Sequence, residues 1–375
     1  MNARERFLET LCFGQPNRIP LEPGSGRMST RERWYNEGLP REITDITLYA
    51  YQQAGGTEFP DANFEPFEID ERMIPQFEEK VIEQKERSRI VQDWKGNICE
   101  IGNEFTVEYL RSGIDFVTRR WIKCPVENRA DWEAMKKRYD ANDPSRYPAD
   151  ADQKREVWEN RTRPIGISFS GPFWQLREWV GFENLCMMFI EDPVLVKDMI
   201  HFWEDYVSRM LLKTLSLTSL DYFYISEDMA YKCFSMISPA MCREFLLPTW
   251  KRWGELVHQN NIPLYICDSD GYIGELIPLW IEAGINVCDP IEVAAGNDIV
   301  ELRKKFGKNI AYRGGVDKRA MAKGGKVIEN EMKRIEPVIR SGGYIPGCDH
   351  GVPSDVSWPD FVHYVKILAQ MTGWL

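Results

Sequence analysis

The sequence predicts an α/β protein built as a (β/α)8 TIM barrel, with an N-terminal helical extension and a β-hairpin/helical insertion. From residue 164 onward, short β-prone runs alternate with amphipathic runs of helical length. Such alternation produces right-handed βαβ units and a parallel sheet. Nearly every β-prone run ends in polar residues or glycine, as expected where barrel strands converge on an active-site face. The sequence has no GxGxxG turn and no P-loop, which favours the barrel over a nucleotide-binding sheet.

The elements before residue 164 are expected in this order. Residues 1–16 form a charged amphipathic helix, and residues 17–27 form a short strand that ends in a glycine-rich loop. Residues 105–126 alternate apolar and polar side chains around a Ser-Gly pair at 112–113, which predicts a hairpin. Residues 131–161 are strongly polar with prolines in the middle, and we expect two exposed helices around a loop.

Six barrel strands and the helices between them are expected in the remainder. The strands lie at 163–173, 220–229, 262–271, 285–292, 309–317 and 342–353. The helices lie at 193–215, 239–259, 272–283, 298–306 and 326–340. The segment "NRIPLEP" and one more strand between residues 50 and 100 bring the total to eight. We therefore expect one barrel domain over residues 1–375, with an insertion at about 100–163.

Composition excludes several classes of function. The 375 residues are 43% hydrophobic, which is ample for a large core. A formal net charge of −11 argues against nucleic-acid binding and against a polybasic membrane surface. No apolar stretch reaches the length of a membrane span. The nine cysteines are irregularly spaced and odd in number, which indicates reduced thiols in a cytoplasm rather than a disulfide framework.

Two aspartates, Asp268 and Asp270, follow an apolar run directly and stand one residue apart. Carboxylates so close repel each other unless a positive charge lies between them. The barrel brings Cys348 and Glu227 within reach, and a divalent ion would offset the repulsion and deprotonate the thiol. A thiolate ligand indicates zinc. The alternative is a turn in which Asp270 caps the next helix while Cys348 fills the core.

Further candidates surround these residues. Trp174 and Trp179 flank Arg177 just after a strand end, where aromatic walls would suit a flat ring, although core packing is the alternative. His350 stands two residues beyond Cys348 and is a candidate general acid or partner of a ligand. Tyr312 is a candidate catalytic residue if its strand turns it toward the site.

Two arginines at predicted strand ends, Arg27 and Arg313, are candidate anchors for a substrate carboxylate. Salt bridges to Glu22 or Asp317 are the alternative for both of them.

Six stretches carry a family resemblance: "RFLETLCFGQPNRIPLEPG" at the start, "SGPFWQL" at 170–176, "ISEDMAYKCFSMISP" at 225–239, "DSDGYIGELIPLWIEAGINVCDPIE" at 268–292, "YRGGVDKRAM" at 312–321 and "GGYIPGCDHGVPSDVSW" at 342–358. With them the chain resembles the uroporphyrinogen decarboxylase superfamily, and its methyltransferase branch more than the decarboxylases. The family fold is a (β/α)8 barrel.

The resemblance also implies a metal site. In the methylcobamide:coenzyme M methyltransferases, zinc is held by a His-x-Cys-Gly stretch and by a late Cys. Matching the glycine places Asp268 and Asp270 at the first two positions and Cys348 at the third. Two oxygen donors thus replace one nitrogen and one sulfur, which leaves zinc a stronger Lewis acid, suited to an ether oxygen.

The resulting prediction is a zinc-dependent methyltransferase of the O-demethylase kind. It would move a methyl group from a methoxylated aromatic to the Co(I) corrinoid of a partner protein, with Glu227 as fourth ligand or base. One alternative is a cofactor-free decarboxylase of a carboxylated pyrrole. Another is a non-catalytic barrel that binds a tetrapyrrole or a corrinoid protein. The oligomeric state is left open, with a homodimer as one option.

Overall fold

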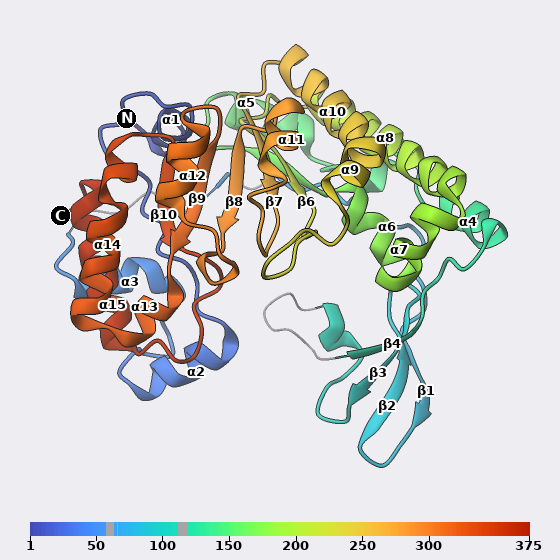
Figure 1. Ribbon diagram of the computed structural model, residues 1–375, viewed down its shortest axis with the longest axis horizontal. Helices are drawn as coiled ribbons and strands as arrows, with labels where there is room; N and C mark the ends of the chain where they lie inside the picture. Colours follow the sequence, from blue (N-terminus) through green and yellow to red (C-terminus); the bar gives the residue numbers. More distant parts are fainter. Residues whose placement is uncertain (58–63, 66, 112–118) are drawn as a thin grey trace. The chain divides into compact units, whose positions relative to one another are not determined.

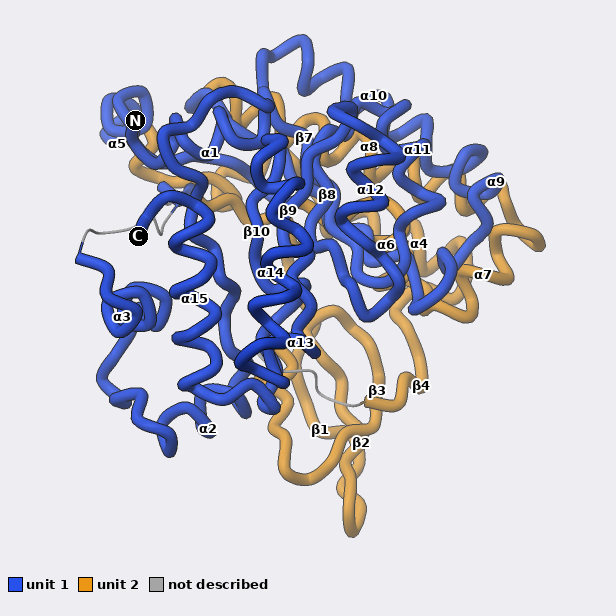
Figure 2. Tube along the Cα trace, turned by 60° about the vertical axis from the view of Figure 1, so that its left-hand side comes forward, with its two compact units in different colours: residues 1–67, 152–168, 217–375 blue, residues 68–151, 169–216 orange. Residues whose placement is uncertain are grey.

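The computed structural model describes residues 1–57, 64–65, 67–111 and 119–375. Within these bounds the chain forms two compact units, coloured separately in Figure 2. Unit 1 comprises residues 1–67, 152–168 and 217–375, and unit 2 comprises residues 68–151 and 169–216. Within the described part of the chain, no helix is long and apolar enough to cross a membrane.

A six-stranded sheet with the order β10-β9-β8-β7-β6-β5 forms the centre of unit 1 (Figure 1). The pairs from β6 to β10 are parallel. Its strands are β5 (Gly166–Ser170), β6 (Tyr222–Ser226), β7 (Leu264–Asp268), β8 (Val287–Ile291), β9 (Ala311–Val316) and β10 (Tyr344–Cys348). The last two residues of β5 belong to unit 2. All six lie within the predicted runs, which confirms the α/β fold class.

Helices alternate with these strands, and α10 packs against β7 while α14 packs against β10 (Figure 1). The helices outside unit 2 are α1 (Ala3–Leu11), α2 (Met28–Asn36), α3 (Ile46–Gln53), α5 (Ala151–Glu159), α9 (Pro239–Met241), the π-helix η3 (Cys242–Leu246), α10 (Leu247–Gln259), α11 (Ile277–Glu282), η4 (Val293–Ala295), α12 (Ile299–Phe306), α13 (Lys318–Lys323), α14 (Gly325–Arg340) and α15 (Trp358–Thr372). The helices predicted at 239–259, 298–306 and 326–340 are confirmed.

Two predicted helices are shorter than expected. The helix expected at 1–16 ends at Leu11, because Phe13 adopts a positive φ of 59°. The helix expected at 272–283 begins only at Ile277, because the chain first turns through Gly271 at a φ of 82°. The predicted caps therefore change as well: the first residue before α11 is Leu276, and Asp270 does not cap this helix.

Irregular segments lie beside both edges of the sheet, where the two further barrel strands are expected. Along β10, Cys348 N–H donates to the Pro23 carbonyl at 3.3 Å, and Gly26 forms a parallel bridge with Val352. Beside the start of β5, Glu65 N–H donates to the Pro164 carbonyl at 3.1 Å. The strand expected at 17–27 does not form a regular ladder, since prolines at 20 and 23 lack the N–H that a ladder needs. The fold is nevertheless of the predicted TIM-barrel type.

One face of the sheet carries an apolar layer toward the amino ends of its strands. Helix α1 covers this layer with Phe7 and Leu11. The buried residues beneath it come from four neighbouring strands: Leu264, Ile266, Val287, Ala311 and Ile345. The amphipathic N-terminal helix therefore closes the amino end of the sheet, and the polar residues of the same face are left toward the carboxyl end.

Unit 2 contains a four-stranded antiparallel sheet with the order β1-β2-β3-β4. Its strands are β1 (Lys80–Gln84), β2 (Ser88–Gln92), β3 (Ile98–Gly102) and β4 (Arg119–Lys123). Its helices are η1 (Glu108–Arg111), α4 (Arg129–Lys136), η2 (Pro144–Arg146), α6 (Pro172–Val180), α7 (Phe182–Glu191) and α8 (Pro193–Leu215). The helix predicted at 193–215 is confirmed as α8.

The hairpin predicted at 105–126 needs a correction. Its Ser-Gly turn at 112–113 lies outside the described residues. The upstream flank contains the 3-10 helix η1 rather than a strand, and β4 pairs instead with β3. The two helices expected around a loop at 131–161 are confirmed as α4 and α5. The single barrel domain with an insertion at about 100–163 stays a prediction.

Candidate functional site

Polar side chains of neighbouring strands meet toward the carboxyl end of one face of the sheet. Helix α1 covers the amino end of the same face. The register pairs Ser226 with Asp268 and Asp268 with Asp289, so all three side chains point to the same side. Arg313 of β9 is directed at the same place, because its guanidinium binds Asp289. Together with Glu22, which follows Leu21 in the segment beside β10, these residues form what we call the interior cluster.

Arg313 lies at the centre of the interior cluster. Its Nη1 is 2.8 Å from Oδ2 of Asp289, and its Nη2 is 2.7 Å from Oε2 of Glu22. The hydroxyl of Tyr224 also donates to Oδ2 of Asp289, at 3.4 Å. Burial raises the pKa of Asp289, an effect that the Arg313 charge opposes. The salt bridge between Arg313 and Glu22, which the sequence leaves as an alternative to substrate binding, is thus present in the structure.

Asp268 is held by a hydrogen bond from a hydroxyl group, whereas Asp289 is held by an ion pair with Arg313. Oδ2 of Asp268 accepts a hydrogen bond from the Ser226 hydroxyl at 2.9 Å. Burial, followed by the charge of Asp289, raises the pKa of Asp268 well above its usual value. A neutral carboxyl group here reduces the repulsion that three carboxylates around one guanidinium would otherwise create.

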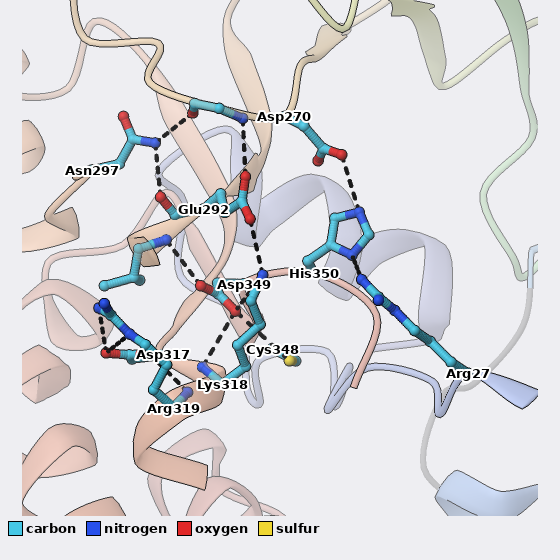
Figure 3. A network of polar contacts seen from close by, with 12 residues as sticks. Arg27, Asp270, Glu292, Asn297, Asp317, Lys318, Arg319, Cys348, Asp349 and His350 are labelled. Carbon is cyan, nitrogen blue, oxygen red and sulfur yellow. Dashed lines mark hydrogen bonds and ion pairs between the residues drawn. The ribbon is translucent and has the colours of Figure 1, made fainter. Parts of the chain in front are cut away.

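A second group of polar residues lies at the loops that follow the strands (Figure 3). The imidazole of His350 lies between two side chains, with Nε2 3.1 Å from Oδ2 of Asp270 and Nδ1 3.1 Å from Nη2 of Arg27. A guanidinium can only donate, so Nδ1 accepts from Arg27 and Nε2 carries the hydrogen that is donated to Asp270. The hydrogen bond to Asp270 raises the pKa of His350. Asp270 therefore orients His350.

Ion pairs and backbone hydrogen bonds connect the same loops. Lys318 Nζ is 2.9 Å from Oε1 of Glu292, and Oε2 of Glu292 accepts from Gly271 N–H at 3.0 Å (Figure 3). Asp349, which is fully buried, accepts from Val293 N–H at 2.9 Å and from Lys318 N–H at 3.3 Å. These contacts join the loops after β7, β8, β9 and β10. They position Asp270 and His350, which are the immediate neighbours of Gly271 and Asp349.

The three predicted zinc ligands do not fit a metal site. Asp268 binds Ser226 and Asp270 binds His350, while Cys348, only 6% exposed, has its sulfur 4.0 Å from Oδ1 of Asp349. Burial, followed by Asp349, raises the pKa of Cys348 to about 12, which keeps the thiol protonated. Among the described residues, no three His, Cys, Asp or Glu side chains are placed to hold a metal ion. Each predicted ligand is engaged by a different partner instead.

Glu227 and Tyr312, both predicted to be catalytic, lie outside the interior cluster. Glu227 is 0% exposed, and its Oε1 accepts a hydrogen bond from the Trp250 indole of α10 at 2.5 Å. Tyr312 alternates with Arg313 along β9 and is also fully buried, with the Arg303 guanidinium of α12 5.0 Å from its ring centre. Both side chains therefore face helices that pack on the sheet.

Trp174, Arg177 and Trp179 belong to α6 of unit 2. Trp179 is fully buried, and its indole N–H donates to the Tyr139 hydroxyl at 3.1 Å. It thus follows the core-packing alternative. Trp174 and Arg177 are partly exposed, with the guanidinium 4.0 Å from the centre of the indole ring. The substrate-binding role of Trp174 and Arg177 stays a prediction.

The sequence reasoning missed three members of the interior cluster as site residues: Glu22, Ser226 and Asp289. A usable signal existed, because Asp289 ends a predicted strand just as Asp268 does. Its role depends on the register between β7 and β8, which periodicity alone cannot give. Glu22 was named only as a salt-bridge partner, since its segment lies about 290 residues from Arg313 in the chain.

These features define an α/β protein of barrel type with a polar site toward the carboxyl ends of parallel strands. A sequence profile described as Uroporphyrinogen decarboxylase (URO-D) matches residues 108–370. The chain belongs to the uroporphyrinogen decarboxylase family, which confirms the predicted superfamily.

Solved structures extend the likeness to the whole fold. A methyltransferase from Methanosarcina mazei superposes with a TM-score of 0.58 over 99% of each chain, at 12% sequence identity. A B12-independent methionine synthase from Shewanella sp. W3-18-1, in complex with selenomethionine, reaches a TM-score of 0.40 at 9% identity, over 60% of this chain and 66% of that one. No curated protein has a sequence that matches this chain. At these identities the likeness concerns the fold alone.

Proposed function

We propose that the protein transfers a methyl group from a small methoxylated aromatic to the reduced corrinoid of a separate partner protein. Membership of the family and the fold shared with a methyltransferase support this class of reaction. The observation that carries the proposal is the interior cluster, which sets hydrogen-bonding groups above an apolar layer. A small molecule with an apolar ring and an ether oxygen suits such a surface.

The charge of the interior cluster favours a substrate with few carboxylates. Three carboxyl groups, those of Glu22, Asp268 and Asp289, surround one guanidinium, and Arg313 is already paired with two of them. A substrate that carries several carboxylates would be repelled here, since no additional cation of the cluster could pair with it. An uncharged methyl ether avoids this repulsion.

The reaction breaks a bond between oxygen and a methyl carbon. The corrinoid, when its partner protein delivers it, supplies the electron pair that takes the methyl group. The chain's own residues hold the substrate: Ser226 and Asp268 offer hydrogen bonds to its oxygen, and Arg313 keeps Asp289 in place beside them. Zinc is not included in the proposal, because its predicted ligands do not converge. The nine free thiols suit a reducing compartment such as the cytoplasm.

A cofactor-free decarboxylase is the second candidate, and one observation favours it. The neighbouring carboxyl groups of Asp268 and Asp289 could stabilise a cationic pyrrole ring. The scarcity of unpaired cations in the interior cluster counts against it, since a carboxylated pyrrole needs partners for its acids.

A turnover assay separates the candidates. The purified protein is incubated with methoxybenzene, which is uncharged, and a reduced corrinoid protein, and methylcobamide absorbance and the phenol product are measured. Asp289→Asn should lower the rate of methyl transfer by about 100-fold. The substitution removes the carboxylate charge that pairs with Arg313 and helps to orient the polar groups. Asp205→Asn is the matched control, since Asp205 is 64% exposed and pairs with Arg209 on α8.

Three results would contradict the proposal. Release of CO2 from a carboxylated pyrrole without a methyl acceptor would establish the decarboxylase. Tight binding of a tetrapyrrole or a corrinoid protein without turnover would indicate a non-catalytic barrel. Equal rates for Asp289→Asn and Asp205→Asn would remove the interior cluster from the reaction.

A further inference from the structure

One side of strand β6 faces the interior cluster, and its side chains change from aromatic to polar along the strand. Phe223 and Ile225 are fully buried on the other side of the sheet. Tyr222, Tyr224 and Ser226 alternate with them and therefore share the side that carries the cluster. Tyr222 and Tyr224 pack on the apolar layer beneath helix α1, whereas Ser226 belongs to the cluster. Tyr224 lies at the boundary between the two regions.

The hydroxyl group of Tyr224 reaches into the interior cluster. The register places Tyr224 opposite Ile266, two residues nearer the amino end than Asp268. Its hydroxyl nevertheless donates to Oδ2 of Asp289, which lies opposite Asp268 on the next strand. The ring therefore extends toward the carboxyl end of the sheet, and the hydroxyl lies level with the carboxyl groups of the cluster. All of these residues belong to unit 1.

The hydrogen bond from Tyr224 to Asp289 is long. Its donor and acceptor are 3.4 Å apart, whereas a hydroxyl donor normally lies about 2.7–2.8 Å from an oxygen acceptor. The same Oδ2 atom already accepts a hydrogen bond from Arg313 at 2.8 Å. Burial, followed by the charge of Asp289, raises the pKa of Tyr224 well above its usual value, so the hydroxyl keeps its proton. Tyr224 is therefore a protonated donor whose present hydrogen bond is weak enough to be exchanged for one to a ligand oxygen.

The donors of the interior cluster itself are engaged at shorter distances. The hydroxyl of Ser226 donates to Asp268 at 2.9 Å. Both Nη atoms of Arg313 lie within 2.8 Å of a carboxylate oxygen. Compared with these groups, Tyr224 offers a donor that a ligand can take with a smaller loss of existing contacts.

We propose that Tyr224 is a further catalytic residue, whose hydroxyl donates a hydrogen bond to the aromatic oxygen from which the methyl group departs. The inference rests on the proposed methyl transfer. In that step the bond between oxygen and the methyl carbon breaks and the oxygen keeps its electron pair, while the acceptor's electron pair forms the new bond to the same carbon. The hydrogen bond from Tyr224 strengthens as negative charge develops on the oxygen, which lowers the barrier. The phenolate afterwards takes a proton from water, and Tyr224 keeps its own.

The position of Tyr224 also suits the shape of a methoxylated aromatic. Its ring lies on the apolar layer, and its hydroxyl lies beside the carboxyl group of Asp289. A substrate ring that packs on the same layer would present its oxygen at the level of this hydroxyl. The alternative is that Tyr224 only positions Asp289. In that case its loss would affect every substrate equally, whereas a donor to the departing oxygen matters most where that oxygen is least stable.

The first test measures the binding of a product analogue to the full chain, without any methyl acceptor. The probe is 4-nitrophenol, and the reference ligand is nitrobenzene, which has no hydroxyl group. We expect Tyr224→Phe to weaken the binding of 4-nitrophenol about 10-fold and to leave that of nitrobenzene unchanged, because only the phenol oxygen accepts the hydrogen bond. Tyr35→Phe is the control, since Tyr35 is a partly exposed residue of α2 whose ring lies 4.6 Å from the Arg41 guanidinium.

Three outcomes of this first test would overturn the proposal. The wild type does not bind 4-nitrophenol, or Tyr224→Phe binds it as tightly as the wild type does, or the substitution weakens the binding of both ligands to the same extent.

The second test compares two methyl donors that differ in the stability of the departing phenolate. The phenolate of methoxybenzene is poorly stabilised, whereas the nitro group of 4-methoxynitrobenzene draws charge away from the oxygen. Tyr224→Phe should lower kcat for methoxybenzene about 100-fold and kcat for 4-methoxynitrobenzene much less, with KM little changed. An equal loss for both donors would reduce Tyr224 to a positioning residue, and an unchanged rate with methoxybenzene would refute the hydrogen bond. If the wild type transfers no methyl group, the proposed function fails, while the binding of 4-nitrophenol still reports on Tyr224.

Discussion

At the scale of single residues, compensation of charge explains most of the interior cluster. Arg313 is 17% exposed and binds two carboxylates that lie far apart in the sequence. It was predicted to hold a substrate carboxylate, yet its two Nη atoms already hold Glu22 and Asp289. Both arginines were predicted at strand ends, but Arg313 lies within β9 and Arg27 directly precedes α2. The partners of Arg313 were not predictable, because several carboxylates end neighbouring strands and only the register selects among them.

Replacement of Arg313 by methionine should destabilise the protein by about 2–3 kcal/mol at pH 8, since two partly buried carboxylates lose their shared cation. Without that cation, the rise that burial causes in the pKa of Asp289 loses its largest opposing influence. The loss of stability is then present at high pH and diminishes as pH falls and Asp289 takes up a proton. Urea unfolding at pH 5 and pH 8 measures the effect. Arg209→Met, which removes an exposed ion pair of α8, should change stability little at either pH.

In the native protein, Glu71 should also make the free energy of unfolding depend on pH, because burial raises its pKa. Its pKa of about 7 when folded exceeds the usual value of 4.5, so the native state binds more protons between these two values. Stability should therefore fall as pH rises from 4.5 to 7, by an amount on the order of 2 kcal/mol. Glu71→Gln should remove this contribution, so that the mutant gains stability relative to the wild type above pH 7. The same difference in stability between the two proteins at every pH from 4 to 8 would contradict the raised pKa of Glu71.

At the scale of elements, the segment beside β10 depends on a close approach that only glycine permits. Gly24 has a φ of 98°, and a Cβ built there would lie 2.8 Å from Cβ of Cys348. The segment carries Glu22 to Arg313 and Arg27 to His350, so this approach connects the edge of the sheet with the site.

Gly24→Ala should therefore lower the free energy of unfolding by more than the backbone strain of the positive φ alone would do. Gly38 provides the control, because it has a similar φ of 112° and nothing lies within 4 Å of a Cβ built there. We expect Gly38→Ala to cost about 1 kcal/mol, and Gly24→Ala about 2 kcal/mol more. Chemical denaturation of both variants measures the difference. Equal losses would show that the segment can move away from Cys348 without cost.

The elements themselves were largely predictable. The runs at 220–229, 262–271 and 309–317 each enclose a strand, because alternating apolar character reports burial directly. The strands of unit 2 were not predicted, apart from part of β4. In β1 every residue is exposed, so no apolar pattern marks this strand.

At the scale of the whole molecule, the main departure from expectation is that the three predicted zinc ligands do not converge among the described residues. Joint placement at strand ends suggested that Asp268, Asp270 and Cys348 share one ion. The ends of neighbouring strands lie close together, but the direction of each of these three side chains is set by its own polar contact.

The purified protein should accordingly contain substoichiometric zinc. Treatment with a chelator should leave its thermal unfolding unchanged, since a structural zinc site would contribute many kcal/mol. Cys348→Ala should not alter the metal content measured by atomic emission. One zinc per chain, lost in Cys348→Ala, would show that Asp268, Asp270 and Cys348 share a metal ion as the sequence predicts.

The order of strands and helices, the family and the location of polar residues at strand ends were determined by the sequence itself, because periodicity and local motifs encode which residues are buried and where elements stop. The tertiary structure alone decided which charges meet. Arg313 selects Glu22 and Asp289, His350 selects Asp270 and Arg27, and Glu71 meets the end of β5. Such contacts join residues distant in the chain, and register and side-chain direction, rather than residue type, determine them.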